Sequence, residues 1–351
     1  MRKNLTTNLK TNFKKLAMLT LPLTLAATHV SAADEVNIYS YRQQFLIQPM
    51  LEAFTADTGI KTNVIFAKKG LIERLQHEGK NSPADIVLTS DIGPLYDVVE
   101  KGLTQPVVSE VLTQNIPAHY RDPANHWFGL TSRTRLIYAS KERVAEGEIK
   151  TYEELADPKW KGRICTRSGK HTYNLSLIGS MIAHHGEAEA EQWLEGLKAN
   201  LARKPQGNDR AQVKAVKEGV CDIALGNSYY FGKMITNEEQ PEQKEWANAV
   251  NLIFPNQDDR GAHMSISGAA LTKYAPNKEN AIKLMEFLSE EQAQSMYAEA
   301  NFEFPVRPGT KRSPLLDQYM GDFKQDSINL QKIAELRAQA ARMADKVGFD
   351  N

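Results

Sequence analysis

The order of strands and helices in the first part of the chain is the feature that most restricts its fold. Residues 35–40 alternate apolar and polar side chains, as a half-buried strand does. A helix with apolar residues at helical spacing is predicted over 45–58, and a second strand over 61–67. Another helix at 70–78 and a buried strand at 84–89 continue the pattern. This β-α-β-α-β order predicts an α/β fold with a mostly parallel sheet and helices on both faces.

A long predicted strand divides the rest of the chain into two lobes. Residues 131–138 are expected to leave the first lobe and enter the second, and residues 251–254 to return. The chain is long enough for each lobe to have its own core. The predicted segments are a leader at 1–32, a first lobe at 33–131 plus 255–307, and a second lobe at 132–254 plus 308–351.

Residues 1–32 have the composition of a Sec-type signal peptide. A basic start precedes an apolar run at 16–27, and Val30-Ser31-Ala32 supplies small residues for cleavage near Ala32. The apolar run is too short to cross a bilayer. We therefore expect a mature protein in the periplasm, with secretion to the medium as the alternative. Without its basic leader the chain is mildly acidic, which argues against nucleic-acid binding.

The chain contains two cysteines, Cys165 and Cys221. In an oxidising compartment such an even pair indicates one disulfide. Each cysteine lies at a predicted strand end, so a bridge would join the segments that lead to Tyr173 and Tyr229. The alternative is two buried free thiols.

Three tyrosines form the most informative motif. Tyr229 and Tyr230 follow a buried strand at 221–225, within a glycine-flanked segment at 226–233 that we expect to be a loop. Tyr173 lies after another predicted strand end. Ligands of open α/β sheets bind at the carboxyl ends of strands, where these side chains are expected. Adjacent tyrosines also occur as ordinary packing or surface residues, so the position matters as much as the residue type.

Phenol side chains point to one kind of metal. A phenol titrates near pH 10 in water, so a phenolate at neutral pH needs a strong cation beside it. A trivalent hard ion prefers such charged oxygen ligands, and three phenolates would neutralise Fe(III) completely. Zinc or copper would bind poorly because no imidazole or thiolate converges with the tyrosines. No nucleophile motif, dinucleotide fingerprint or phosphate loop with correct spacing is present.

A small anion is expected beside the metal. Ser168 and Gly169 precede a predicted helix start, where free backbone N–H groups and the helix dipole hold anions. Arg133 and Arg135, on the crossing strand, would clamp a carbonate-like anion. The alternative is that the arginines pair with carboxylates and Ser168 only caps a helix.

Several segments, spread over nearly the whole mature chain, resemble periplasmic ferric-iron-binding proteins of ABC transporters. The resemblance implies a two-lobed periplasmic-binding-protein fold. Each lobe would be a mixed, mostly parallel sheet flanked by helices, and crossing hinge strands would join them. Iron would lie in a cleft that closes around it. The matching segments are 36–40 (VNIYS), 83–86 (PADI), 127–130 (WFGL), 167–169 (RSG), 227–230 (NSYY), 287–289 (FLS) and 304–306 (FPV).

By position, Tyr173, Tyr229 and Tyr230 match the second-lobe metal ligands of that family. The first lobe departs from the pattern, because Gln43 and Gln44 stand where relatives commonly have His or His-Tyr. A branch of the family uses a glutamate near the position of Ser90. We therefore expect Tyr41 as a replacement phenol in the first lobe. Gln43 is expected near the anion.

These observations predict a non-enzymatic, monomeric receptor that captures Fe(III) together with carbonate or another small anion. It would deliver the metal to an ABC-transporter permease in the inner membrane. One alternative is a binding protein of the same fold for an organic solute or oxyanion, such as a polyamine, thiamine or phosphonate. The other is a periplasmic enzyme, for which the sequence offers no recognisable nucleophile and base.

Overall fold

Three short strands near the start of the described chain lie side by side in parallel. β1 (Glu35–Ser40) pairs with β2 (Lys61–Phe66) on one side and β3 (Ile86–Thr89) on the other. The parallel pairing predicted for these three strands is therefore confirmed, within a sheet that is mixed as a whole. The structure is a computed structural model that describes residues 34–351, so the predicted signal peptide at 1–32 lies outside the described residues.

Two long strands continue this sheet toward the other half of the molecule. β8 (Met264–Leu271) pairs antiparallel with β3, and β4 (Phe128–Ser140) pairs antiparallel with β8. All residues of both strands are buried. β4 changes partners along its length: its residues up to Thr134 pair with β8, and those from Arg135 onward pair with β6 (Ile223–Asn227). The predicted crossing strand at 131–138 is therefore correct.

The second half of the sheet is built on the far end of β4. β5 (Ile164–Cys165) lies parallel to β6, and β7 (Val250–Ile253) pairs with the last residues of β4. The full order is β2-β1-β3-β8-β4-β6-β5, with β7 and β9 (Phe304–Pro305) also paired to β4. Residues 251–254 were expected to return to the first lobe, and this was wrong. Their segment pairs only with the far end of β4, and β8 makes the return instead.

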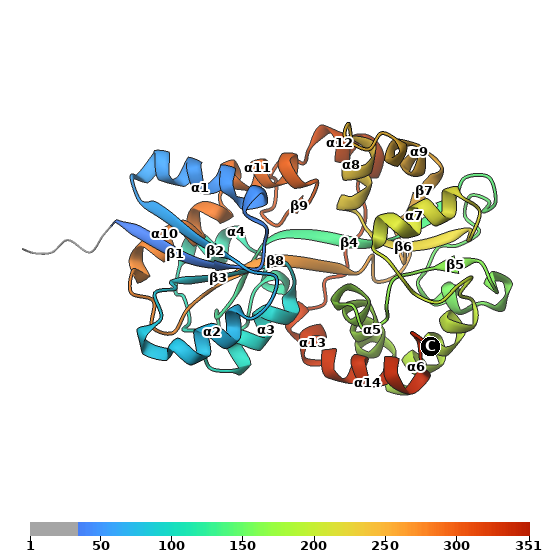
Figure 1. Cartoon of the computed structure of the whole chain (residues 1–351), viewed down its shortest axis with the longest axis horizontal. Helices are drawn as coiled ribbons and strands as arrows, with labels where there is room; N and C mark the ends of the chain where they lie inside the picture. The colour runs from blue at the N-terminus through green and yellow to red at the C-terminus, as the bar shows by residue number, and fades with distance from the viewer. Residues whose placement is uncertain (1–33) are drawn as a thin grey trace, which may run out of the picture. The chain divides into compact units, whose positions relative to one another are not determined.

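Helices cover both faces of each half (Figure 1). We call β1, β2, β3 and β8 with their helices the first lobe, and β5, β6 and β7 with theirs the second lobe. In Figure 1, α1 and α11 lie on one side of the first-lobe sheet, and α2 and α3 on the other. The helices are α1 (Gln44–Thr58), α2 (Leu71–Glu78), α3 (Ile92–Glu100), α4 (Glu110–Asn115), α5 (Thr172–His185), α6 (Glu187–Ala199), α7 (Asp209–Lys217), α8 (Tyr229–Ile235), α9 (Glu242–Asn248), α10 (Lys278–Ser289), α11 (Glu291–Asn301), α12 (Pro314–Met320), α13 (Leu330–Glu335) and α14 (Arg337–Val347).

Two segments near the end of the chain each contain two helices where the sequence predicts one. Residues 280–300 have the spacing of a long amphipathic helix, but Glu290 takes an extended conformation between α10 and α11. A helix is also predicted at 327–347, and this segment is α13 followed by α14. α13 packs against both α3 and α5, so it contacts both lobes.

Candidate metal-binding site

Tyr229 and Tyr230 begin a helix. β6 extends through Asn227, and α8 starts at Tyr229 with Ser228 as its N-cap residue. The expected loop at 226–233 is therefore wrong: the chain passes almost directly from strand to helix. The Tyr138 hydroxyl donates a hydrogen bond to the carbonyl oxygen of Asn227 at 2.8 Å, which fixes this junction. The two tyrosines thus lie at the carboxyl end of a buried strand, as predicted.

Tyr173 lies in the first turn of α5, the helix that follows strand β5 in the chain. His171 caps this helix, and its Nδ1 accepts the Tyr173 N–H at 3.2 Å. A disulfide joins Cys165, at the end of β5, to Cys221, just before β6. The predicted bridge is confirmed, and it fixes the two strands that lead to the tyrosines.

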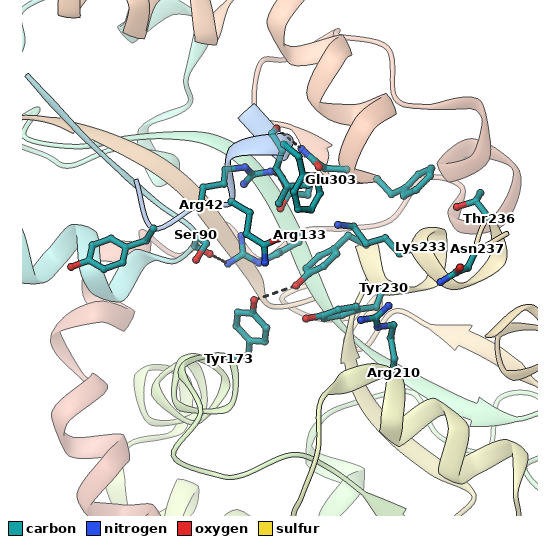
Figure 2. A pocket seen from close by; sticks show the side chains of 17 residues that line it. Arg42, Ser90, Arg133, Tyr173, Arg210, Tyr230, Lys233, Thr236, Asn237 and Glu303 are labelled. Carbon is teal, nitrogen blue, oxygen red and sulfur yellow. Dashed lines mark hydrogen bonds and ion pairs between the residues drawn. The ribbon is translucent and has the colours of Figure 1, made fainter. Parts of the chain in front are cut away.

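The structure brings the three phenols to one side of a single cavity. The hydroxyl oxygens of Tyr173 and Tyr229 are 3.2 Å apart, and the ring centroids of Tyr229 and Tyr230 are 4.2 Å apart. Figure 2 shows Tyr173 and Tyr230 projecting from different elements toward this space, whose volume is about 540 Å³. Tyr41, Gln43 and other first-lobe residues line the opposite part. The cavity therefore lies between the lobes.

Burial dominates the electrostatics of the two closest phenols. It raises the pKa of Tyr173 to about 12, although the nearby Arg133 guanidinium acts in the opposite direction. Burial, followed by the neighbouring phenols Tyr173 and Tyr230, raises the pKa of Tyr229 well above 10. Both hydroxyls are therefore protonated at neutral pH unless a strong cation displaces their protons.

Basic side chains outnumber acidic ones in the lining of the cavity. Four cations line it, and Glu303 is the one acidic residue among the lining side chains. Arg42 forms an ion pair with Glu303 at 2.5 Å. Most of these residues could not be predicted from the sequence, because they come from separate elements and carry no shared motif. The lining cations are Arg42, Arg133, Arg210 and Lys233.

The two arginines of the crossing strand have different roles. Arg133 lines the cavity, and its guanidinium carbon lies 5.5 Å from the Tyr173 ring centroid. Arg135 leaves the same face of β4, two residues further on, and its guanidinium carbon lies 5.9 Å from the same ring centroid. It is buried, forms an ion pair with Asp209 at 2.6 Å and does not line the cavity. Arg133 therefore remains a candidate for anion binding, and the expectation for Arg135 is corrected because a second-lobe carboxylate already pairs with its guanidinium.

Ser168 and Gly169 bind an anionic group that belongs to the chain itself. The Ser168 hydroxyl donates to Asp350 Oδ2 at 2.5 Å, and the Gly169 N–H donates to Asp350 Oδ1 at 2.8 Å. Neither residue lines the cavity. The expectation that they hold a small anion beside the metal is therefore corrected, because a carboxylate near the C-terminus occupies their donors.

The two predicted first-lobe residues, Tyr41 and Gln43, both line the cavity. The Tyr41 hydroxyl accepts the N–H of Ile72 at 2.9 Å, in the first turn of α2. Burial raises the pKa of Tyr41. This phenol thus has a structural partner in the first lobe, whereas Tyr173 and Tyr229 have each other.

Residues 34–351 hold no conventional cluster of metal-binding side chains. No group of three or more His, Cys, Asp and Glu side chains converges there as a metal site would require. His263 is buried and contacts the Ser176 hydroxyl at 3.0 Å. Within the same residues, no helix has the length and apolar character needed to span a membrane.

Two α/β lobes joined by crossing strands, with a polar cavity between them, define the class of two-lobed solute-binding proteins. Residues 81–329 match the family described as bacterial extracellular solute-binding protein. The chain belongs to this family.

The chain is similar to proteins whose names or structure titles refer to iron. Iron uptake protein A1 of Synechocystis sp. is 43% identical over 317 residues, which cover 90% of this chain and 88% of the relative. Ferric iron-binding protein A of Mannheimia haemolytica, solved in an open conformation, is 51% identical with a TM-score of 0.86; the match covers 90% of this chain and 99% of that one. The Trichodesmium protein IdiA (FutA), solved with iron and citrate ligands, is 44% identical with a TM-score of 0.86 over the same shares of the two chains.

Proposed function

We propose that this protein captures Fe(III) in the periplasm and delivers it to an ABC-transporter permease. The observation that carries the proposal is the 3.2 Å separation of the Tyr173 and Tyr229 hydroxyls in a cavity that Tyr230 also lines. The iron-binding relatives support it, since they cover nearly the whole chain. Tyr173, Tyr229 and Tyr230 are the proposed ligands.

The charges of the site fit a trivalent cargo. Three phenolates offset the charge of Fe(III), and the ion in turn supplies the field that removes protons from buried phenols. Metal binding therefore releases protons. The terminal nitrogens of Arg133 already bind Ser267 and Asp91, but its Nε–H has no partner among the described residues. This donor is the one that would bind a small anion such as carbonate, which completes the coordination shell between the phenolates and the first lobe.

The receptor works without catalysis in this proposal. It is a monomer, and the leader at 1–32 directs it to the periplasm. The lobes close around the metal and open at the permease, which releases it.

An anionic organic solute or oxyanion is the second candidate. The observation that favours it is the set of four cations around the cavity, against one carboxylate. Such a ligand would occupy the space without ionising the tyrosines. It would therefore give no phenolate-to-iron absorption when ferric salt is added.

A visible titration tests the proposal. Purified mature protein receives ferric citrate with and without bicarbonate, and the phenolate-to-iron charge-transfer band is recorded. Tyr230→Phe is expected to abolish or strongly shift the band, because it removes one charged ligand. Tyr274→Phe is the matched control, since Tyr274 is exposed and lies outside the cavity. A wild-type protein without the band would refute ferric binding by these phenols.

A further inference from the structure

A buried carboxylate next to the cavity is not explained by metal binding itself. Asp91 follows β3, is 2% exposed and does not line the cavity. It caps α3, where its Oδ1 accepts the Gly93 N–H at 3.1 Å. Capping needs only this bond, yet the carboxylate accepts three more.

Two of these additional hydrogen bonds connect Asp91 to the surroundings of Tyr173, one through Thr172 and the other through Arg133. We call these connections the first and the second route. The Thr172 hydroxyl donates to Asp91 Oδ1 at 2.8 Å, and Thr172 directly precedes Tyr173 at the start of α5. Arg133 Nη2 donates to Asp91 Oδ2 at 3.3 Å. The same guanidinium faces the Tyr173 ring, 5.5 Å from its centroid. The Ser265 hydroxyl, at 3.2 Å, also donates to Oδ2 and holds the carboxylate against β8.

The bond between Asp91 and Thr172 joins the two lobes. Asp91 belongs to the first lobe through α3, and Thr172 belongs to the second lobe through α5. The hydroxyl of Tyr173 lies at the cavity, whereas its backbone lies next to this interlobe contact. A first-lobe side chain is thus bonded to the residue next to a second-lobe phenol.

We propose that Asp91 is a positioning residue for the metal site. One carboxylate oxygen fixes the start of the helix that carries Tyr173, and the other fixes the guanidinium that faces the Tyr173 ring. This inference rests on the proposed function, because it assumes that Tyr173 is a ligand. Partners of this kind, one step removed from the ligands, orient them, and their loss typically lowers metal affinity about 10- to 100-fold.

Thr172→Val tests the first route. The substitution removes the hydroxyl that donates to Asp91 but keeps the branched shape of the side chain. Ferric affinity, measured by competition with citrate, is expected to fall about 10- to 100-fold, and the charge-transfer band to shift. Thr172→Ser keeps the donor and is expected to restore both properties. Thr113→Val is the matched control, because the Thr113 hydroxyl bonds only to backbone oxygens in and next to α4.

Asp91→Asn tests the second route. The amide keeps an acceptor for Thr172 and Gly93 but loses the charge that faces Arg133. We expect a shifted band with a smaller loss of affinity than in Thr172→Val. Thermal unfolding of each variant identifies those that fail to fold.

The outcomes separate this inference from the proposed function. A wild-type protein without the ferric band overturns both. A second outcome is that the wild type shows the band and a folded Thr172→Val protein shows the same band at unchanged ferric affinity. This outcome overturns only the positioning role of Asp91. Failure of Thr172→Ser to restore the band would also overturn it, because the hydroxyl would then not be the cause.

Discussion

Tyr41 differs from the other three phenols of the cavity because its hydroxyl has a backbone partner. Its hydroxyl accepts the Ile72 N–H at the start of α2, where free backbone donors need partners. Tyr41→Phe removes this acceptor, so we expect it to lower the free energy of unfolding by about 1 kcal/mol. We expect the ferric charge-transfer band to stay unchanged. Denaturant unfolding and the visible spectrum check the two effects, and a shifted band would instead make Tyr41 a metal ligand.

His263 is a buried histidine that links stability to pH. Burial, assisted by the charge of Arg135, lowers its pKa to about 3 from the ordinary value of 6.5. The fold therefore favours the neutral ring. Its contribution to stability is complete above the unfolded-state pKa and is lost as the pH falls toward the folded-state pKa.

We therefore expect the free energy of unfolding to fall from pH 6.5 to about pH 3, with a slope from His263 of up to about 1.4 kcal/mol per pH unit. His263→Gln should reduce this slope. Urea unfolding at several pH values measures it, and His77→Gln, at an exposed position, is the control. Equal slopes in the wild type and His263→Gln would contradict the assignment.

At the residue scale, the sequence predicted which side chains can bind a metal better than it predicted which groups they contact. Phenol acidity, charge and the family resemblance pointed to Tyr173, Tyr229 and Tyr230, which line one cavity in the structure. The partners of Ser168 and Arg135 were not accessible, because Asp350 and Asp209 lie far from them in the chain. The type of a polar side chain limits which groups it can bind, but the fold determines which charged group lies next to it.

At the scale of elements, the disulfide between β5 and β6 has the largest expected energetic effect. It closes a loop between cysteines 56 residues apart, and a loop of this length restricts the unfolded chain by about 4 kcal/mol in the chain-entropy model. The Cys165→Ala and Cys221→Ala double variant should lose about this much unfolding free energy.

Denaturant unfolding with and without reductant measures the loss. Wild-type protein under reducing conditions should match the double variant, whereas reductant should not change the double variant itself. We also expect weaker ferric binding, because the bridge fixes both strands that deliver the tyrosines. A loss below about 1 kcal/mol would contradict the chain-entropy account.

Helices and strands followed from periodicity, but their ends and pairings did not. Residues 251–254 have the composition of a strand, and only the register shows that they stay in the second lobe. The 226–233 segment contains two glycines, which suggested a loop, yet tertiary packing makes Tyr229 the first residue of α8. Pairing partners and helix ends depend on contacts between distant segments, which a local pattern does not contain.

At the scale of the whole molecule, the two lobes were predictable because a β-α-β rhythm allows few arrangements. The connection between them depends on β4, whose partner changes from β8 to β6 between Thr134 and Arg135. Arg133 lies just before this change and faces the cavity. The crossing strand therefore joins the lobes and supplies a residue to the site.

This architecture leads to a prediction about shape. The proposed ligands Tyr173, Tyr229 and Tyr230 come from the second lobe, and Tyr41, Gln43 and Glu303 line the cavity from the first. A cargo that attracts groups from both sides favours the closed arrangement by its differential affinity for the two states. Ferric binding should therefore reduce the radius of gyration measured by small-angle X-ray scattering.

Tyr230→Phe should show no such decrease at ferric concentrations that saturate the wild type, and Tyr274→Phe should behave as the wild type does. An unchanged radius in a wild-type protein that develops the charge-transfer band would mean that iron binds without lobe closure, and release at the permease would then need another cause.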